Sequence, residues 1–145
     1  MANVVPYAFP VELLSGTHNF ASDTFKLALY TSSPYTTAST IYDATNETTG
    51  TEYSAGGNTL TGNAVSNVAN YATVDFTDSV WGSPTPATFS AAFGAIYNSS
   101  ASNKLIVVLD FGGTKSCSNG TFTVTFPSPT SGSPSGADAL LSIQS

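Results

Sequence analysis

Three short apolar segments that follow one another across turn-forming residues constrain the fold of this 145-residue chain more than any other feature. They are Phe93–Tyr97, Leu105–Phe111 and Thr121–Phe126, and between them lie Asn98–Asn103 and Gly112–Gly120. Segments of this length, rich in β-branched and aromatic residues and separated by Gly, Asn and Ser, are typical of an antiparallel meander. The sequence therefore predicts consecutive β-strands in this part of the chain.

Hydrophobic periodicity assigns faces to these and other strands. Thr24–Tyr30 alternates, with three large apolar residues on one side, which predicts a half-buried strand. Thr121–Phe126 alternates in the same way. Leu105–Leu109 is apolar on both sides, and this pattern predicts a central strand that is covered on both faces.

The remaining patterns complete an all-β fold. Pro10 at its first position and Gly16 after its end predict a short helix over Pro10–Ser15. Thr31–Gly57 is expected to form a long ordered loop with at most short strands, and residues 128–136, rich in Ser, Pro and Gly, a linker. Further strands are expected at Thr59–Thr61, Ala64–Ala69, Tyr71–Thr77 and Ala139–Ile143.

Together these elements predict an antiparallel β-sandwich with a short N-terminal helical segment and long loops. Residues 1–22 are expected to form an N-terminal arm, and residues 23–145 the β-sandwich. A chain of this length buries enough surface for one core, so a single domain is expected overall.

Charged residues make up only 8% of the chain, against about 25% in an average globular protein. The net charge of −6 and the absence of Arg oppose binding to phosphate, so no nucleic-acid partner is expected. No apolar stretch has the length of a membrane span and the N-terminus lacks a leader pattern, so no membrane partner is expected. A surface with few ions loses little solvation when another protein covers it, which favours a protein that packs against neighbours.

No group of side chains predicts catalysis, a cofactor or a metal site. Asp75 and Asp78 should point to opposite faces of a continuing strand, and Asp110 precedes two glycines, so strand-end roles are expected rather than an acid pair for glycoside hydrolysis. His18 has no second His at ligand spacing and is expected to be a loop residue. Cys117 is expected to be an incidental thiol in a loop. The chain is therefore predicted not to be an enzyme.

The aromatic residues carry the remaining candidates for binding. Trp81 is expected to anchor the core or an edge, with a sugar-stacking platform as the alternative. Tyr35, Tyr42 and Tyr53 in the long loop are the candidate protein-contact residues, because Tyr buries a large area with few rotamers to restrict. The alternative is a loop that folds onto its own domain, and the sequence leaves both open.

Seven short segments, which extend roughly from His18 to Phe126, carry a family resemblance through their order and spacing. They are Asp23–Ser32, Asn46–Glu47, Gly50–Gly57, Asp75–Trp81, Ala95–Asn98, Val108–Gly112 and Gly120–Pro127. In this order they resemble a family of small virion proteins encoded by tailed bacteriophages.

The resemblance implies a structural role without catalysis. It implies a head decoration or cement protein, assembled into the virion in the host cytoplasm, that binds the major capsid protein and stabilises the lattice. It also implies self-association, for which a homotrimer is expected because three-fold positions are docking points on such shells. The alternative is a tail or fibre component that attaches to host-surface glycans.

Overall fold

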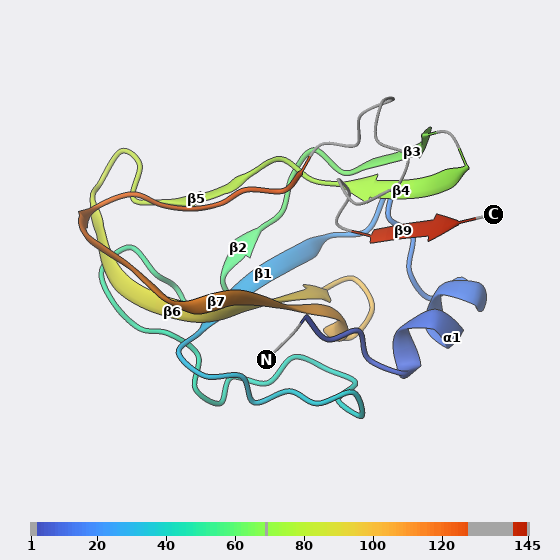
Figure 1. Ribbon diagram of the computed structural model, residues 1–145, viewed down its shortest axis with the longest axis horizontal. Helices are drawn as coiled ribbons and strands as arrows, with labels where there is room; N and C mark the ends of the chain where they lie inside the picture. The colour runs from blue at the N-terminus through green and yellow to red at the C-terminus, as the bar shows by residue number, and fades with distance from the viewer. Residues whose placement is uncertain (1–2, 69, 128–140, 145) are drawn as a thin grey trace.

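The computed structural model describes residues 3–68, 70–127 and 141–144 (Figure 1). Its elements in chain order are α1 (Ala8–Leu14), β1 (Phe25–Tyr30), β2 (Asn58–Thr59), β3 (Ala64–Val68), β4 (Tyr71–Asp75), β5 (Ser79–Trp81), β6 (Ala87–Asn98), β7 (Lys104–Gly120), β8 (Phe122–Val124) and β9 (Leu141–Gln144). The strands pair antiparallel, so the predicted all-β fold is confirmed. The predicted linker at 128–136 and the first two residues of the predicted strand at 139–143 lie outside the described residues.

The strands lie in two facing layers. The lower layer in Figure 1 is a four-stranded sheet in the order β2-β1-β6-β7. The upper layer holds the pair β5-β8 and the small sheet β3-β4-β9. Phe25, Leu27 and Ile96 of the lower sheet share one core cluster with Trp81 and Phe122 of the upper layer. The main core therefore lies between the layers, as in a β-sandwich.

β1 is buried on both faces, so the prediction of a half-buried strand at Thr24–Tyr30 is wrong. Ala28 and Tyr30 point away from the main core, yet both are fully buried. They belong to a second cluster with Tyr35, against which Val4 of the N-terminal arm also packs. The arm and the long loop thus cover the outer face of the four-stranded sheet, a covering that strand periodicity does not reveal.

The loop between β1 and β2 is long and without extended strands, as predicted. It is held to the four-stranded sheet by backbone bridges, and its Tyr53 packs against the main core between the layers. Three of these bridges join Tyr30 to Glu47, Ile41 to Lys104, and Thr51 to Thr88.

β7 lies at the edge of the four-stranded sheet, so the prediction of a central strand at Leu105–Leu109 is wrong. Its burial on both faces is confirmed from Leu105 to Val108, each at most 3% exposed, whereas Leu109 is half-buried. The cover on the open edge comes from Val4, whose backbone exchanges two hydrogen bonds with Val108 (2.9 and 2.8 Å). An edge strand can therefore be as apolar as a central one where another segment covers it.

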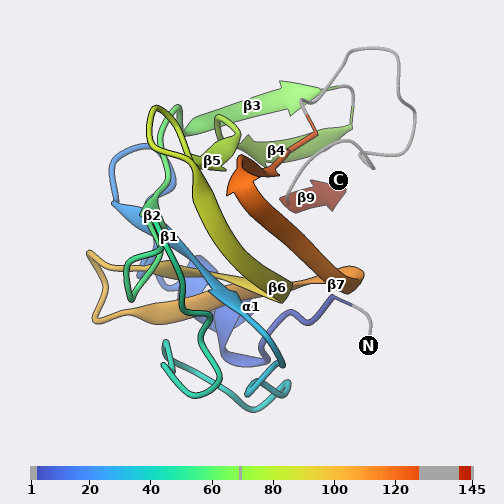
Figure 2. The ribbon, with the colours of Figure 1, turned by 90° about the vertical axis from the view of Figure 1, so that its left-hand side faces the viewer.

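β7 also continues through the predicted turn at Gly112–Gly120. Gly112 and Gly113 have φ angles of +70° and +120°, which glycine adopts without strain. They form a bulge between the Phe93–Asp110 and Ala91–Lys115 pairs, after which pairing with β6 resumes. β6 and β7 therefore form a longer hairpin than predicted, and Figure 2 shows the two strands side by side.

The third segment of the predicted meander does not join this hairpin. β8 crosses to the upper layer and pairs with β5, so the meander prediction is wrong at this step. The alternation of Thr121–Phe126 is confirmed, with Phe122, Val124 and Phe126 buried and the three threonines exposed. The chain changes layer after Gly120, which ends β7.

α1 begins two residues before the predicted start of the helix and ends at Leu14. Pro10 lies in the first turn, where a missing N–H removes no intrahelical bond. Gly16 follows the end with a φ of +76°, in agreement with its predicted role. Within the described residues, no helix has the length and apolar character that a membrane-spanning helix needs.

Candidate contact surface

The candidate contact residue Tyr35 points into the domain. Its side chain is 4% exposed, and its hydroxyl lies 2.7 Å from the hydroxyl of Tyr30. The backbone N–H of Asp43 donates a hydrogen bond to the same Tyr35 oxygen (2.9 Å). Burial raises the pKa of the Tyr35 hydroxyl. Tyr35 is thus part of the packing beneath the long loop.

Tyr42 and Tyr53 converge on one carboxylate of the same loop. The Tyr42 hydroxyl donates to Glu47 Oε2 (2.5 Å), and the Tyr53 hydroxyl donates to Glu47 Oε1 (2.6 Å). The N–H of Gly56 donates to Oε1 as well (2.7 Å). Burial, and after it the hydrogen bond to Glu47, raises the pKa of both tyrosines. These internal partners favour the alternative interpretation, a loop folded onto its own domain.

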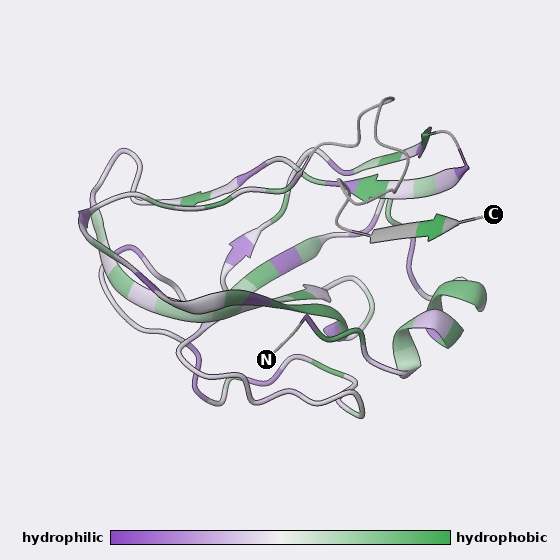
Figure 3. Cartoon of the chain, in the orientation of Figure 1, coloured by the Kyte–Doolittle hydropathy of each residue, from purple (hydrophilic) through white to green (hydrophobic). Residues whose placement is uncertain are grey.

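Exposed apolar side chains gather at a different place. Eight large hydrophobic residues in the described part of the chain are exposed, and six of them lie on the N-terminal arm or on the small sheet beside it. We call these six residues the apolar end: Val5, Tyr7, Val11, Leu14, Val65 and Ile143. Figure 3 shows α1 as a largely hydrophobic ribbon beside the green segments of β4 and β9. This gathering makes the apolar end a candidate contact surface.

α1 contributes a stripe to the apolar end. Tyr7, Val11 and Leu14 recur at the spacing of one helical face and are 74%, 68% and 90% exposed. The helix buries Phe9 on its other side. Glu12 is its one charged residue, and Lys104 neutralises that charge. The outward face of α1 is therefore apolar and carries no unpaired charge.

A groove runs between α1 and the small sheet and belongs to the same surface. Its volume is about 660 Å³. Phe9 and Leu13 line it from the helix, and Val65, Val74 and Ile143 line it from β3, β4 and β9. Three residues of the apolar end, Val5, Val65 and Ile143, line this groove, whereas the stripe on α1 lies on a different side of the helix from Phe9.

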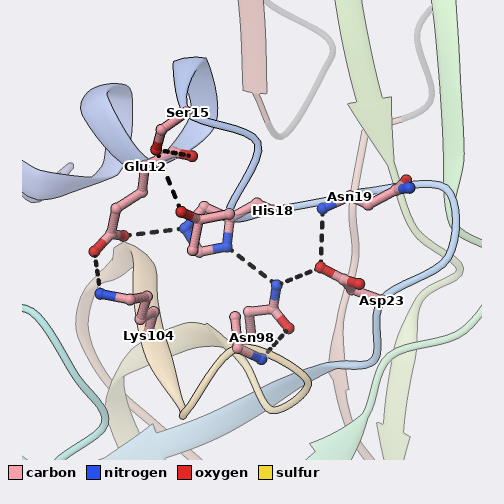
Figure 4. A network of polar contacts seen from close by, with 9 residues as sticks. Glu12, Ser15, His18, Asn19, Asp23, Asn98 and Lys104 are labelled. Atoms are coloured by element: carbon pink, nitrogen blue, oxygen red, sulfur yellow. Dashed lines mark hydrogen bonds and ion pairs between the residues drawn. The ribbon is translucent and has the colours of Figure 1, made fainter.

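A chain of polar contacts ties α1 to the sandwich next to this groove (Figure 4). Lys104 Nζ pairs with Glu12 Oε1, and His18 Nε2 lies 3.1 Å from Glu12 Oε2. On its other side, His18 Nδ1 lies 3.1 Å from Asn98 Nδ2. Asn98 Nδ2 also donates to Asp23 Oδ2 (2.7 Å). The contacts thus link the helix, the following loop and the tip of the β6-β7 hairpin.

The charges around Glu12 determine its ionisation. Burial raises the pKa of the Glu12 carboxyl, but the hydrogen bonds and charges of Lys104 and His18 together outweigh burial. The net shift of the pKa is downward from 4.5. Glu12 is therefore an ionised acceptor for both neighbours at neutral pH.

The other residues singled out in the sequence have local roles. Trp81 is 3% exposed, which confirms the predicted core anchor. His18 lies in a loop as predicted, but it is buried by Phe9 and Phe20. Cys117 lies in β7 and not in a loop, because the strand continues past the bulge.

The three aspartates make separate contacts. Asp75 Oδ1 accepts from the N–H of Phe76, and Asp78 Oδ1 accepts from the N–H of Phe126. Asp110 Oδ1 accepts from the N–H of Gly112. Asp75 ends β4, as the sequence predicts, whereas Asp110 lies within β7 beside the bulge and Asp78 bonds across 48 positions. Among the described residues, no group of three or more His, Cys, Asp or Glu is placed to hold a metal ion.

Sequence reasoning missed both the apolar stripe and the polar chain. The stripe has a signal, since Tyr7, Val11 and Leu14 follow the helical period, but a helix placed at Pro10 excludes its first member. The polar chain has none, because His18 and Asn98 are 80 positions apart.

Comparison of the chain with protein families, with curated proteins and with solved structures found no match.

Proposed function

We propose that this chain is a structural protein of a bacteriophage virion, a head decoration protein that binds the major capsid protein through its apolar end. The observation that supports the contact surface is the gathering of six of the eight exposed large hydrophobic residues around α1 and its groove. The phage role itself is supported by the order and spacing of the segments between His18 and Phe126.

The energetics of this surface suit docking on a lattice. The exposed side chains of the apolar end supply part of the roughly 800 Å² that one partner brings to a standard interface. With 8% charged residues, few ions have to be desolvated when a capsid subunit covers this end. On a shell with repeated sites, contacts of modest affinity add through multivalency.

Binding to shells that lack the chain tests this proposal. Leu14→Ser and Val11→Ser should each weaken co-sedimentation with such shells by roughly tenfold, because they place a hydroxyl in the apolar contact. Val80→Ser is the matched control, since this side chain is 43% exposed and lies on β5 in the upper layer, away from α1 (Figure 1). The control should bind like the unmodified chain.

Two results contradict the proposal. Equal loss of binding in the Val80→Ser control contradicts the apolar end as the contact surface. Labelling of the virion that is confined to the tail contradicts a head decoration protein and favours the tail alternative. The stoichiometry on the shell, together with the mass of the free protein in solution, tests the proposed homotrimer.

A further inference from the structure

Only one orientation of the Asn98 side-chain amide gives each of its neighbouring groups a matching donor or acceptor. Its Oδ1 accepts hydrogen bonds from the N–H groups of Ser100 (2.9 Å) and Ala101 (3.2 Å). Its Nδ2 faces the carboxylate of Asp23 at 2.7 Å. Rotation of the amide by 180° would place the oxygen against a carboxylate and the NH₂ group against two donors. The second hydrogen of Nδ2 is therefore directed at His18 Nδ1.

This orientation determines the tautomer of His18. Since Nδ1 accepts from Asn98, the ring proton is on Nε2, where it donates to Glu12 Oε2. The imidazole side chain is fully buried, so water does not replace either partner. Each donor in the series Asn98, His18 and Lys104 thus meets an acceptor, and the series ends on the Glu12 carboxylate.

α1 is also held by apolar packing of Phe9 and Leu13 on the main core and by the hydrogen bond from the Tyr7 N–H to the Thr37 carbonyl (2.9 Å). It has seven residues, its N-cap residue Tyr7 makes no side-chain capping bond, and Phe9 is its one buried residue. Isolated helices of this length are unstable in water. The contacts of Glu12 with His18 and Lys104 add side-chain hydrogen bonds between this helix and the sandwich.

We infer that the polar chain of Asn98, His18, Glu12 and Lys104 holds α1 against the β6-β7 hairpin. In this position α1 presents the apolar end to the capsid protein. These are positioning residues, because they act through the helix and do not form the exposed surface themselves. The inference about presentation rests on the proposed function. The attachment of α1 does not, and it can be measured on the free protein.

Hydrogen exchange of the full-length chain tests the attachment. His18→Phe keeps an aromatic ring against Phe9 and Phe20 but removes both hydrogen bonds, whereas His18→Gln restores a donor towards Glu12. The reporters are the amides of Ser15, Gly16 and Thr17, which bond back to carbonyls of α1. His18→Phe should speed their exchange roughly tenfold relative to the amides of β1, and His18→Gln should do so less.

A matched control removes a polar contact elsewhere. Ser116→Ala deletes the exposed hydroxyl pair with Ser90, 2.8 Å apart, and should leave α1 exchange unchanged. Nitrogen NMR of the unmodified protein should show His18 with its proton on Nε2. A proton on Nδ1, or exchange in His18→Gln as fast as in His18→Phe, overturns the inference. Equal acceleration in α1 and β1 overturns it too, because the effect is then global.

Shell binding separates this inference from the proposed function. His18→Phe should weaken binding to shells although the apolar end itself is unchanged. If α1 exchanges faster while shell binding stays the same, the presenting role is wrong and the proposed function stands. If the unmodified chain fails to bind shells, the proposed function is wrong, while the exchange experiment still decides whether the chain of contacts holds α1.

Discussion

The long loop after β1 and the apolar end differ in whether their side chains are bonded within the domain or exposed to a partner. The loop carries three tyrosines, a residue type favoured at interfaces, yet their hydroxyls bond to groups of the same domain. The apolar end carries aliphatic residues and one exposed Tyr, and these side chains lie open. A contact surface is therefore defined by side chains that the fold leaves without neighbours. Residue type alone does not define it.

The largest effect should come from removing a ring beneath the loop. Tyr35→Ala should lower the free energy of unfolding by about 3–5 kcal/mol, because it empties a buried site and leaves the Asp43 N–H without its acceptor. Urea denaturation of the two proteins measures this. A stability within about 0.5 kcal/mol of the unmodified chain would mean that Tyr35 is free for a partner after all.

A smaller loss should follow when one hydroxyl of the loop is deleted. Tyr53→Phe removes a donor to Glu47 and the acceptor for the N–H of Leu29 (2.9 Å). We expect a cost of about 1–3 kcal/mol, because partly buried polar groups lose their partners while the ring remains. Thermal unfolding of the variant checks this. Weaker shell binding with unchanged stability would instead indicate that the loop is a contact surface.

Acid should weaken the hold on α1. The pKa of Glu12 is lower in the folded chain than in the unfolded one, so its contribution is complete above pH 4.5 and is lost as the pH falls through the folded value. The charged or titratable neighbours are Lys104, His18 and, beyond Asn98, Asp23. The unmodified chain should therefore lose more stability than Glu12→Gln between pH 6 and about pH 3. Parallel pH profiles contradict this.

The smallest effect on stability is expected at the apolar end itself. Leu14→Ser should change the free energy of unfolding by less than about 0.5 kcal/mol, because the side chain is 90% exposed and packs on nothing that folding requires. Denaturation curves of this variant and of Tyr35→Ala compare the two regions directly. A large loss in Leu14→Ser would place that residue in the core of an oligomer that forms on folding.

The sequence by itself determined the all-β class and most of the strands. Alternation at Thr121–Phe126 describes burial correctly, and the two-sided apolar pattern of Leu105–Leu109 does so as far as Val108, because apolar side chains favour burial wherever other segments can cover them. The short helix between Pro10 and Gly16 was also located within two residues, since Pro and Gly act on the local backbone.

Tertiary structure alone decided which strands are neighbours and which surface remains open. β7 is an edge strand and β8 pairs across the sandwich, because pairing depends on segments far apart in the chain. The burial of Ala28 and Tyr30 depends on the loop and the arm that cover them. His18 meets Asn98 across 80 positions, so no local pattern could predict their contact. The exposure of the apolar end also depends on tertiary structure, because it is decided by which segments of the folded chain cover those side chains.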